Sequence, residues 1–223
     1  MINSNSAEPA NDSDQDRHLH DYVTPPFLVV AVGASAGGLE AFSLLLGAMP
    51  SDAPLAVVLV QHLSRTHESQ LAEILATRTA LGVLTATDGV RVESGYVYVI
   101  SPDTHMTVID GHLRVRRRPK GYFSMQIDAL FESVAEFYGD KAVGVVLSGA
   151  LQDGSEGFRA IKAAGGVTFA QLPEEAQTES MPRAAISTGD VDMVLPAQEI
   201  GEELLRLAVL PRFKDDHLTT PGA

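Results

Sequence analysis

Short, uninterrupted apolar runs separated by amphipathic helical patterns are the feature that most restricts the fold of this chain. A strand that is apolar on both faces is expected where helices cover both sides of a parallel sheet. Five runs have this character: residues 27–32 (FLVVAV), 55–60 (LAVVLV), 142–147 (AVGVVL), 167–171 (VTFAQ) and 191–195 (VDMVL). Their alternation with helices predicts an α/β fold, a doubly wound, mostly parallel sheet with helices on both faces.

Helical periodicity is clearest in residues 126–138, where apolar side chains recur at the spacing of one helix face. These side chains are Ile127, Leu130, Phe131, Val134 and Tyr138. Residues 68–78 (ESQLAEILATR) and 197–209 (AQEIGEELLRLAV) show a similar pattern. We expect a helix in each of these three segments.

One region breaks the alternation of strands and helices. Residues 95–101 (GYVYVIS) and 105–118 (HMTVIDGHLRVRRR) are typical of strands, and Asp110-Gly111 is a hairpin-turn dipeptide. We therefore expect an antiparallel hairpin on the edge of the sheet. The second of its strands is rich in basic residues, which either discourage edge-to-edge aggregation or attract an acidic substrate. The basic residues are Arg114, Arg116, Arg117, Arg118 and Lys120.

The ends of the chain differ from its middle. Residues 1–26 are rich in Asn, Asp and Ser and have no periodicity, so they are predicted to be a disordered N-terminal tail. Residues 211–223 are predicted to be a flexible C-terminal tail. Residues 27–210 are left as one domain, which is an ordinary size for a single core.

The composition excludes several classes of function. The formal net charge is −13, so the surface repels phosphate backbones and nucleic acid is not an expected partner. There is no cysteine, which removes disulfides and thiolate chemistry. No apolar run approaches the ~18 residues of a membrane-spanning helix. We expect a soluble, cytoplasmic protein without direct membrane insertion.

The glycine turn after the first predicted strand could hold a phosphate or present a nucleophile. The dinucleotide fingerprint G-x-G-x-x-G needs a second glycine where this chain has Ser35. It also needs an acidic residue after the second strand, where Gln61 and His62 stand. The pattern G-x-S-x-G, in contrast, is matched by residues 33–37 (GASAG) and is typical of a nucleophilic serine. The alternative is that Ser35 only caps the following helix.

A nucleophilic serine needs a base, and two histidines are candidates. His62 follows the second predicted strand directly, and Asp153 follows the strand at 142–147. Because the carboxyl ends of parallel strands share one edge of the sheet, Ser35, His62 and Asp153 are expected there together, as in an acyl-transfer site. His105 is the rival base, and Asp153 could instead be a turn or helix-capping residue.

Several motifs in a fixed order carry a family resemblance. They are GASAGG at 33–38, VQHL at 60–63, HMTV at 105–108, LSGALQDGSEG at 147–157 and MPRAAISTG at 181–189. Over residues 28–207 the chain resembles the catalytic domain of chemotaxis protein-glutamate methylesterases of the CheB type. The resemblance implies hydrolysis of glutamate methyl esters, and in some members deamidation of glutamine, on the helical cytoplasmic region of chemoreceptors. It also implies no metal and no organic cofactor.

The resemblance places the catalytic serine on Ser35, the histidine on His62 and the aspartate on Asp153. Backbone N–H groups near Ala36 and Ala150 are the candidates for stabilising the oxyanion. Met181 is either a wall of the substrate pocket or a core residue, and Arg183 is a second candidate for that wall.

The chain also departs from the family pattern. Ala36 replaces a frequent threonine, and Ala150-Leu151 replaces Met-Gly, so that Leu151 must adopt a conformation that suits glycine. Residues 1–26 are too few for the receiver domain that precedes well-known members, so regulation is expected from a separate receiver protein, or the enzyme is constitutive. The alternatives are a catalytically weak module that binds receptor helices and a nucleotide-binding α/β domain.

Overall fold

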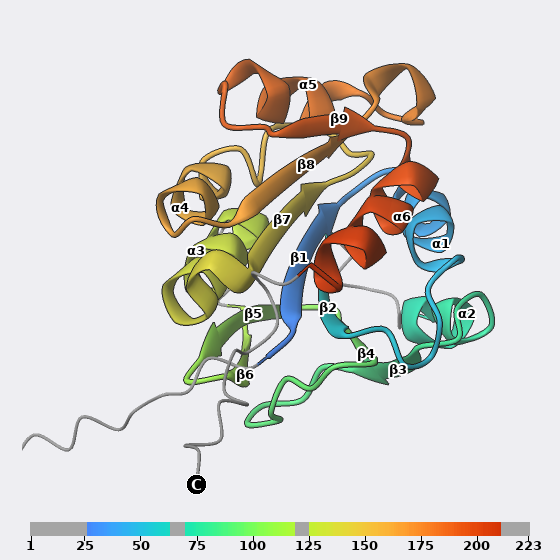
Figure 1. Ribbon diagram of the computed structural model, residues 1–223, viewed down its shortest axis with the longest axis vertical. Helices are drawn as coiled ribbons and strands as arrows, with labels where there is room; N and C mark the ends of the chain where they lie inside the picture. Colours follow the sequence, from blue (N-terminus) through green and yellow to red (C-terminus); the bar gives the residue numbers. More distant parts are fainter. Residues whose placement is uncertain (1–25, 63–69, 119–124, 211–223) are drawn as a thin grey trace, which may run out of the picture.

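The computed structural model describes residues 26–62, 70–118 and 125–210. Its centre is a seven-stranded parallel sheet with the strand order β3-β4-β2-β1-β7-β8-β9 (Figure 1). The strands are β1 Leu28–Ala34, β2 Leu55–Gln61, β3 Gly82–Thr85, β4 Tyr96–Val99, β7 Ala142–Val146, β8 Val167–Gln171 and β9 Met193–Leu195. The chain builds one half of the sheet outward from β1 through β2 and the other half outward through β7. The order therefore reverses between β1 and β7, where sheets of this kind bind ligands.

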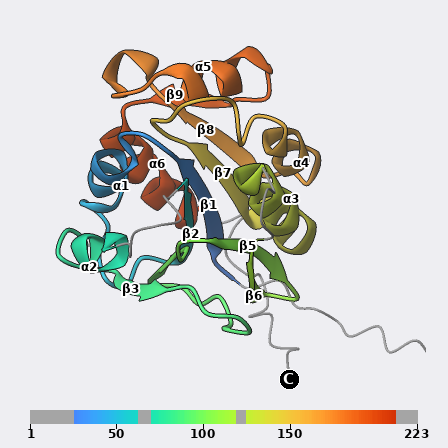
Figure 2. The ribbon, with the colours of Figure 1, turned by 180° about the vertical axis from the view of Figure 1, so that it is seen from behind.

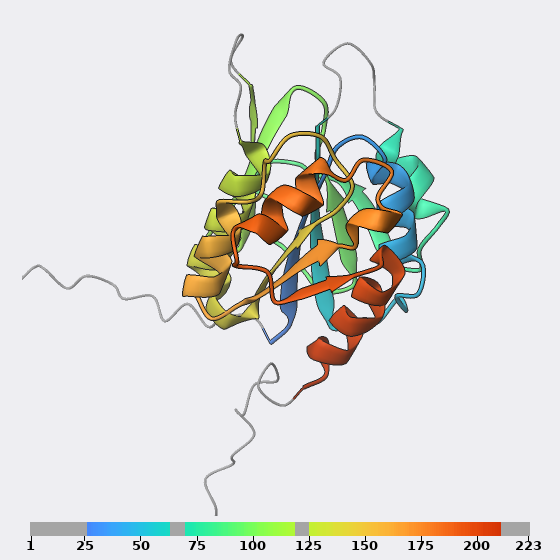
Figure 3. The same cartoon turned by 90° about the horizontal axis from the view of Figure 1, so that it is seen from above.

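Helices cover both faces of the sheet, and Figure 3 shows the strands between the two helical layers. One layer contains α1 Gly38–Leu46, α2 Leu71–Ala76 and α6 Ala197–Ala208. The other contains α3 Gln126–Tyr138, α4 Gly157–Ala163 and α5 Ser180–Ser187. Two short 3-10 helices, η1 Gly139–Lys141 and η2 Pro173–Glu175, complete the helical segments. The predicted doubly wound α/β fold is confirmed.

The central strand β1 shows why the apolar runs are continuous. Leu28, Val30 and Val32 point into the core under α1 and α6, whereas Val29 and Ala31 point into the core under α3. All seven residues of β1 are buried. A strand with a hydrophobic layer on each side cannot alternate apolar and polar residues, because both faces exclude water.

The expected hairpin forms, but in a different place. Strands β5 Thr104–Ile109 and β6 His112–Arg117 pair antiparallel around Asp110 and Gly111, whose φ angles of 52° and 72° suit a tight hairpin turn. They make a separate two-stranded sheet and are not an edge of the main one. The hairpin packs against α3 (Figure 2). Its apolar residues, including Met106, Val108 and Leu113, are buried in the same core as α3, and this burial fixes its position.

Residues 95–101 also behave differently from the expectation. They contain β4, which pairs parallel with β2 on one side and with β3 on the other. The edge strand β3 has no counterpart among the predicted strands. Its sequence, GVLT, is half-exposed and too short to give a pattern.

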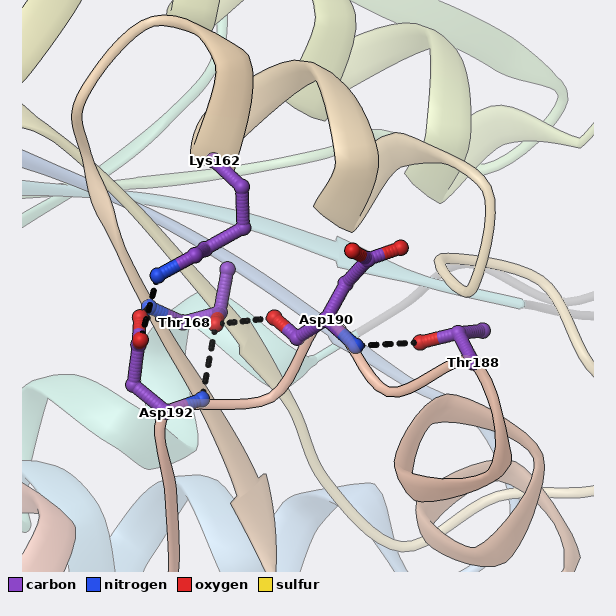
Figure 4. Close-up of polar contacts among 5 residues, drawn as sticks. All are labelled: Lys162, Thr168, Thr188, Asp190 and Asp192. Atoms are coloured by element: carbon purple, nitrogen blue, oxygen red, sulfur yellow. Dashed lines mark hydrogen bonds and ion pairs between the residues drawn. The ribbon is translucent and has the colours of Figure 1, made fainter.

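The far edge of the sheet is attached by a polar cluster around Thr168, near the amino end of β8 (Figure 4). The Thr168 hydroxyl donates to the carbonyl of Asp190 at 2.6 Å and accepts from the backbone N–H of Asp192 at 3.0 Å. Lys162 of α4 pairs with the Asp192 carboxylate. The cluster fixes the segment that enters β9, and it lies at the opposite end of β8 from the strand ends where ligands are expected.

The two predicted tails, residues 1–26 and 211–223, lie outside the described residues except for Pro26. In the part of the chain that the structure describes, no helix has the length and apolar character needed to cross a membrane.

Candidate active site

Ser35 lies at the carboxyl end of β1, between its two neighbouring strands. Ala34 pairs with Gln61 in the β1–β2 register, so Ser35 and His62 follow directly on paired residues. The backbone N–H of His62 donates to the carbonyl of Ala34 at 3.2 Å. The backbone N–H of Ser35 donates to the carbonyl of Ser148, just beyond β7, at 3.0 Å. The three central strands therefore deliver Ser35, His62 and the loop that carries Asp153 to one edge of the sheet.

His62 and Asp153 are hydrogen-bonded through their side chains. The distance from His62 Nε2 to Asp153 Oδ2 is 2.7 Å. A carboxylate can only accept, so Nε2 carries a proton in this pair and Nδ1 holds the lone pair of the neutral ring. The His62 side chain is 26% exposed, whereas that of Asp153 is 3% exposed. A partly open histidine held by a buried carboxylate is suited to take and return a proton.

The Asp153 carboxylate is anchored at the start of α3. It accepts from the backbone N–H groups of Ile127 and Asp128 at distances of 3.1 to 3.2 Å. N–H groups at a helix N-terminus have no partner within the helix, and they stabilise negative charge there. Asp153 thus caps a helix, as one alternative expected, but the helix is α3 and the same carboxylate holds His62.

The turn that carries Ser35 depends on Gly37. Gly37 has a φ of 81°, and a Cβ built on it would lie 2.5 Å from the Ser148 hydroxyl and 2.7 Å from Gln177 Cβ. Any other residue would therefore have to displace packed neighbours. The N-cap position of α1 is Gly37, with no side-chain capping bond, so the structure does not support a capping role for Ser35.

The peptide that joins Ser35 to Ala36 is held in one orientation. The carbonyl of Ser35 accepts from the Gln61 side chain and from the N–H of Gly38, each at 3.1 Å. Because a trans peptide directs its N–H opposite to its C=O, the N–H of Ala36 points away from these donors. Within the described residues, the N–H groups of Ala36 and Ala150 have no acceptor. Both are available as donors to an oxyanion.

Met181 lies beside Ser35 and is also part of the core. It is fully buried. A Cβ built on Gly149 would lie 2.0 Å from Met181 Sδ and 3.0 Å from Ser35 Cβ, so Gly149 separates the two residues by a single backbone layer. Both expectations for Met181, the pocket wall and the core, are compatible with this position. Arg183 is an exposed residue that pairs with Glu174 and Glu179.

Leu151 adopts the expected left-handed conformation. Its φ is 73°, and its side chain is 76% exposed. An exposed leucine at positive φ gains little packing energy to offset the steric cost of that conformation, so local strain remains in the loop between Ala150 and Asp153.

The rival base His105 lies on β5, where it pairs with Arg116 across the hairpin. Burial lowers its pKa, and the charge of Arg118 lowers it further. Its Nδ1 atom is buried and has no hydrogen-bond partner among the described residues. No hydrogen bond or ion pair joins His105 to Ser35, His62 or Asp153 in that part of the chain.

The sequence reasoning missed Asp128, which is buried directly behind Asp153. Burial raises the pKa of Asp128 to about 6, the hydrogen bond from Gly157 opposes this rise, and the nearby charge of Asp153 adds to it. A signal was available, because Asp128 falls on the buried face of the helix pattern between Ile127 and Phe131. The described residues contain no cluster of three or more His, Asp or Glu side chains that could hold a metal ion.

Comparison with known proteins agrees with this architecture. Residues 30–204 match the sequence model of the CheB methylesterase family. A relative from Leptospira interrogans is 34% identical over 180 residues, which are 80% of this chain and 93% of the relative. The protein-glutamate methylesterase/protein-glutamine glutaminase of Rhizobium etli is 38% identical over 80% of this chain and 53% of its own length. The chain thus spans about half of that relative.

A solved structure shows the same fold. The crystal structure of the Thermotoga maritima CheB methylesterase catalytic domain superimposes with a TM-score of 0.75 at 30% sequence identity. The match covers 81% of this chain and 98% of that one. The family model covers the part of the sheet that carries Ser35, His62 and Asp153. The chain belongs to the CheB methylesterase family.

Proposed function

We propose that this protein hydrolyses methyl esters of glutamate side chains in a signalling protein, with Ser35 as nucleophile, His62 as base and Asp153 as the group that orients His62. The observation that carries the proposal is the 2.7 Å hydrogen bond between His62 and Asp153 at the end of the strand next to Ser35. Relatives named protein-glutamate methylesterase/protein-glutamine glutaminase support the reaction class.

The first half of the reaction forms an acyl-enzyme. Ser35 Oγ attacks the ester carbonyl while Nδ1 of His62 takes the serine proton. The proton on Nε2 stays in the hydrogen bond to Asp153, which stabilises the cationic ring. The tetrahedral intermediate then collapses, and His62 donates its new proton to the leaving methoxide. The products are methanol and a glutamyl ester of Ser35.

The second half regenerates the enzyme. A water molecule gives a proton to His62 and attacks the acyl-enzyme, and His62 returns a proton to Ser35 as glutamate leaves. In both halves a negative oxygen develops, and the N–H groups of Ala36 and Ala150 are the proposed donors to it. The fixed Ser35 carbonyl keeps the Ala36 N–H in position before the substrate arrives.

The same site could act on glutamine, because only the leaving group differs. His62 would donate its proton to the leaving amide nitrogen, which departs as ammonia in place of methanol, and the same acyl-enzyme would form. An amide is a less reactive acyl donor than an ester, so deamidation is expected to be the slower reaction. The relatives' names include this second activity.

The proposed substrate is the helical cytoplasmic region of a methylated chemoreceptor, which places the reaction in the cytoplasm. A methylated glutamate side chain is small, so the surrounding helix must supply much of the specificity. We also propose a separate receiver protein as the regulator. The weak binding module and the nucleotide-binding domain find less support, because the site contains a hydrogen-bonded His62–Asp153 pair and lacks the glycine and carboxylate of the nucleotide fingerprint.

Methanol release from a methylated receptor preparation tests the proposal. Wild-type protein should release methanol, and Ser35→Ala should reduce the rate by ~10⁴-fold or more, since a triad acts as a unit. Ser43→Ala is the matched control, because Ser43 lies on α1, where its hydroxyl donates to the carbonyl of Leu39 and accepts from the Arg78 side chain. Receptor binding without methanol release by wild-type protein would favour the binding module instead.

A further inference from the structure

Two buried aspartates cap each other's helices behind His62. Asp153 precedes α4, yet its carboxylate accepts from backbone N–H groups in the first turn of α3. Asp128 lies in the first turn of α3, yet its carboxylate accepts from the N–H of Gly157, the first residue of α4, at 2.7 Å. The two side chains are therefore locked together by reciprocal backbone bonds.

The space around this pair leaves no room for a looser arrangement. A Cβ built on Gly157 would lie 2.7 Å from Phe131 Cβ and 3.0 Å from Asp128 Cα, so α4 begins in direct contact with α3. Asp128 is 5% exposed and Asp153 is 3% exposed. Two carboxyl groups so close in a buried site repel each other when both are ionised.

The charged groups on neighbouring elements do not neutralise this pair. Strands β1, β2 and β7, which pack on α3, carry no ionisable side chain. On α4, Arg159 pairs with Glu156 and Asp190, and Lys162 pairs with Asp192. The other ionisable groups on elements that pack on α3 are His105 of β5 and, at the far end of α3, Asp140 and Lys141 of η1. On α3 itself, Glu132 and Glu136 are exposed.

We propose that Asp128 is a positioning residue of the active site, which forms with Asp153 a two-carboxyl unit that holds His62 and sets its affinity for a proton. The inference rests on the proposed role of His62 as base. Asp128 does not touch the substrate. It acts through Asp153, whose Oδ2 atom contacts His62 Nε2.

The charge of Asp128 is the variable part of the unit. When Asp128 is ionised, a second negative charge lies behind Asp153 and stabilises the protonated form of His62, which makes His62 a stronger base. When Asp128 carries a proton, only one negative charge faces His62. Burial raises the pKa of Asp128 to about 6, so the change occurs close to the pH range in which a histidine itself titrates.

The pH dependence of kcat/KM tests the unit. Asp128→Asn keeps an oxygen that can accept from Gly157 but removes the charge. We expect the acid limb of the profile, which reports neutral His62, to move to lower pH by roughly one unit. On the plateau, kcat should fall several-fold while KM is unchanged, because the variant has a weaker base. A fall in kcat with the acid limb unmoved would show a structural role only and overturn the proposal.

Glu132→Gln is the matched control, because it removes one negative charge from the exposed side of the same helix. Its profile should coincide with that of wild type. An equal shift of the acid limb in both variants would show a general effect of net charge and would also overturn the proposal that Asp128 and Asp153 act as a unit.

NMR titration of His62 separates this inference from the proposed function. In the Ser35→Ala protein, without substrate, the His62 midpoint should be lower after Asp128→Asn. A lower midpoint would support the role of Asp128 even if wild-type protein released no methanol. Methanol release without a change in the His62 midpoint would reject the role of Asp128 but not the proposed function. If Asp128→Asn does not fold, wild-type protein still decides: Asp128 and His62 should titrate in shared steps, and two independent curves would contradict the coupling.

Discussion

The sulfur of Met181 occupies the space into which a side chain at Gly149 would grow. A Cβ built on Gly149 would lie 2.0 Å from Met181 Sδ and 3.0 Å from Ser35 Cβ. We expect Gly149→Ala to destabilise the fold by about 1–3 kcal/mol, as overpacking does, and to lower kcat because Ser35 is displaced. Urea unfolding and methanol release measure the two effects.

Shortening Met181, whose sulfur would contact the new methyl group, serves as a control. Met181→Ala alone leaves a cavity and should cost about 2–5 kcal/mol. The double variant should lose less stability than the sum of the two single variants, because the shortened side chain makes room at Gly149. Strict additivity would show that the backbone, and not Met181, resists the new methyl group.

The two histidines should respond very differently to substitution. His62→Gln is expected to reduce methanol release by ~10⁴-fold, because the base and the nucleophile act together. His105→Gln should change the rate by only a few-fold, since His105 pairs with Arg116 in the hairpin, whereas His62 is the histidine bonded to Asp153. A large loss at His105 with an active His62 variant would transfer the role of base to His105.

Asp128 also makes the stability of the fold depend on pH. Its pKa is raised to about 6 by burial, above the model-peptide value of 3.8. Between these values the unfolded chain releases the proton before the folded chain does, so the free energy of unfolding decreases as pH rises from about 4 to 6. The Asp128→Asn variant cannot titrate at this position, so its free energy of unfolding should not decrease in this way. Relative to wild type, its stability should therefore increase by roughly 1–3 kcal/mol from pH 4 to pH 7. Denaturant unfolding at several pH values measures this, and Glu132→Gln should show no such trend.

The hydrophobic pattern of the sequence correctly predicted segments that are buried over most of their length. The helix over 126–138 and the strand over 167–171 have the predicted bounds, because each segment is buried along its whole pattern. The register that places Ser35 beside His62 follows from parallel pairing of two adjacent buried strands. These features need no knowledge of distant contacts.

Features that depend on distant contacts could not be read in the same way. The hairpin at 104–117 has a clear turn signal, but its packing on α3 depends on a helix later in the chain. The helix pattern could indicate that Asp128 is buried, but not its hydrogen bond from Gly157, which depends on the packing of α4 against α3. The alternative role for Asp153 was to cap the helix that follows it, but its carboxylate caps α3.

The strain at Leu151 predicts a stabilising substitution. Leu151→Gly removes the steric cost of a φ of 73°, and because the side chain is 76% exposed little packing is lost. We expect a gain of about 0.5–1 kcal/mol in the free energy of unfolding, after the greater freedom of glycine in the unfolded chain is included. Leu44→Gly is the control, because Leu44 is also exposed but lies within helix α1, where glycine should cost about 1 kcal/mol. A loss at both positions would mean that Leu151 is not strained.

The basic strand β6 gives a test of how the substrate is attracted. Arg116 forms an ion pair with Asp88 at 2.5 Å. The ion pair of Arg117 with Asp103 is longer, at 3.4 Å, and the Arg117 side chain is 88% exposed. Arg117 is therefore the better point from which to attract the acidic receptor helix that we propose as substrate. Lys120 lies outside the described residues.

We expect Arg117→Gln to lower kcat/KM on the intact receptor by a few-fold at low salt and to flatten its salt dependence, because steering weakens as ions screen it over ~10 Å at 0.1 M. Hydrolysis of a small neutral methyl ester should not change. Arg206→Gln is the control, since Arg206 lies on α6 in the other helical layer and pairs with Glu203. Equal effects of the two arginine variants would mean that only net charge matters, and no effect of Arg117→Gln on either substrate would leave β6 with the role of a solvated, aggregation-resistant strand.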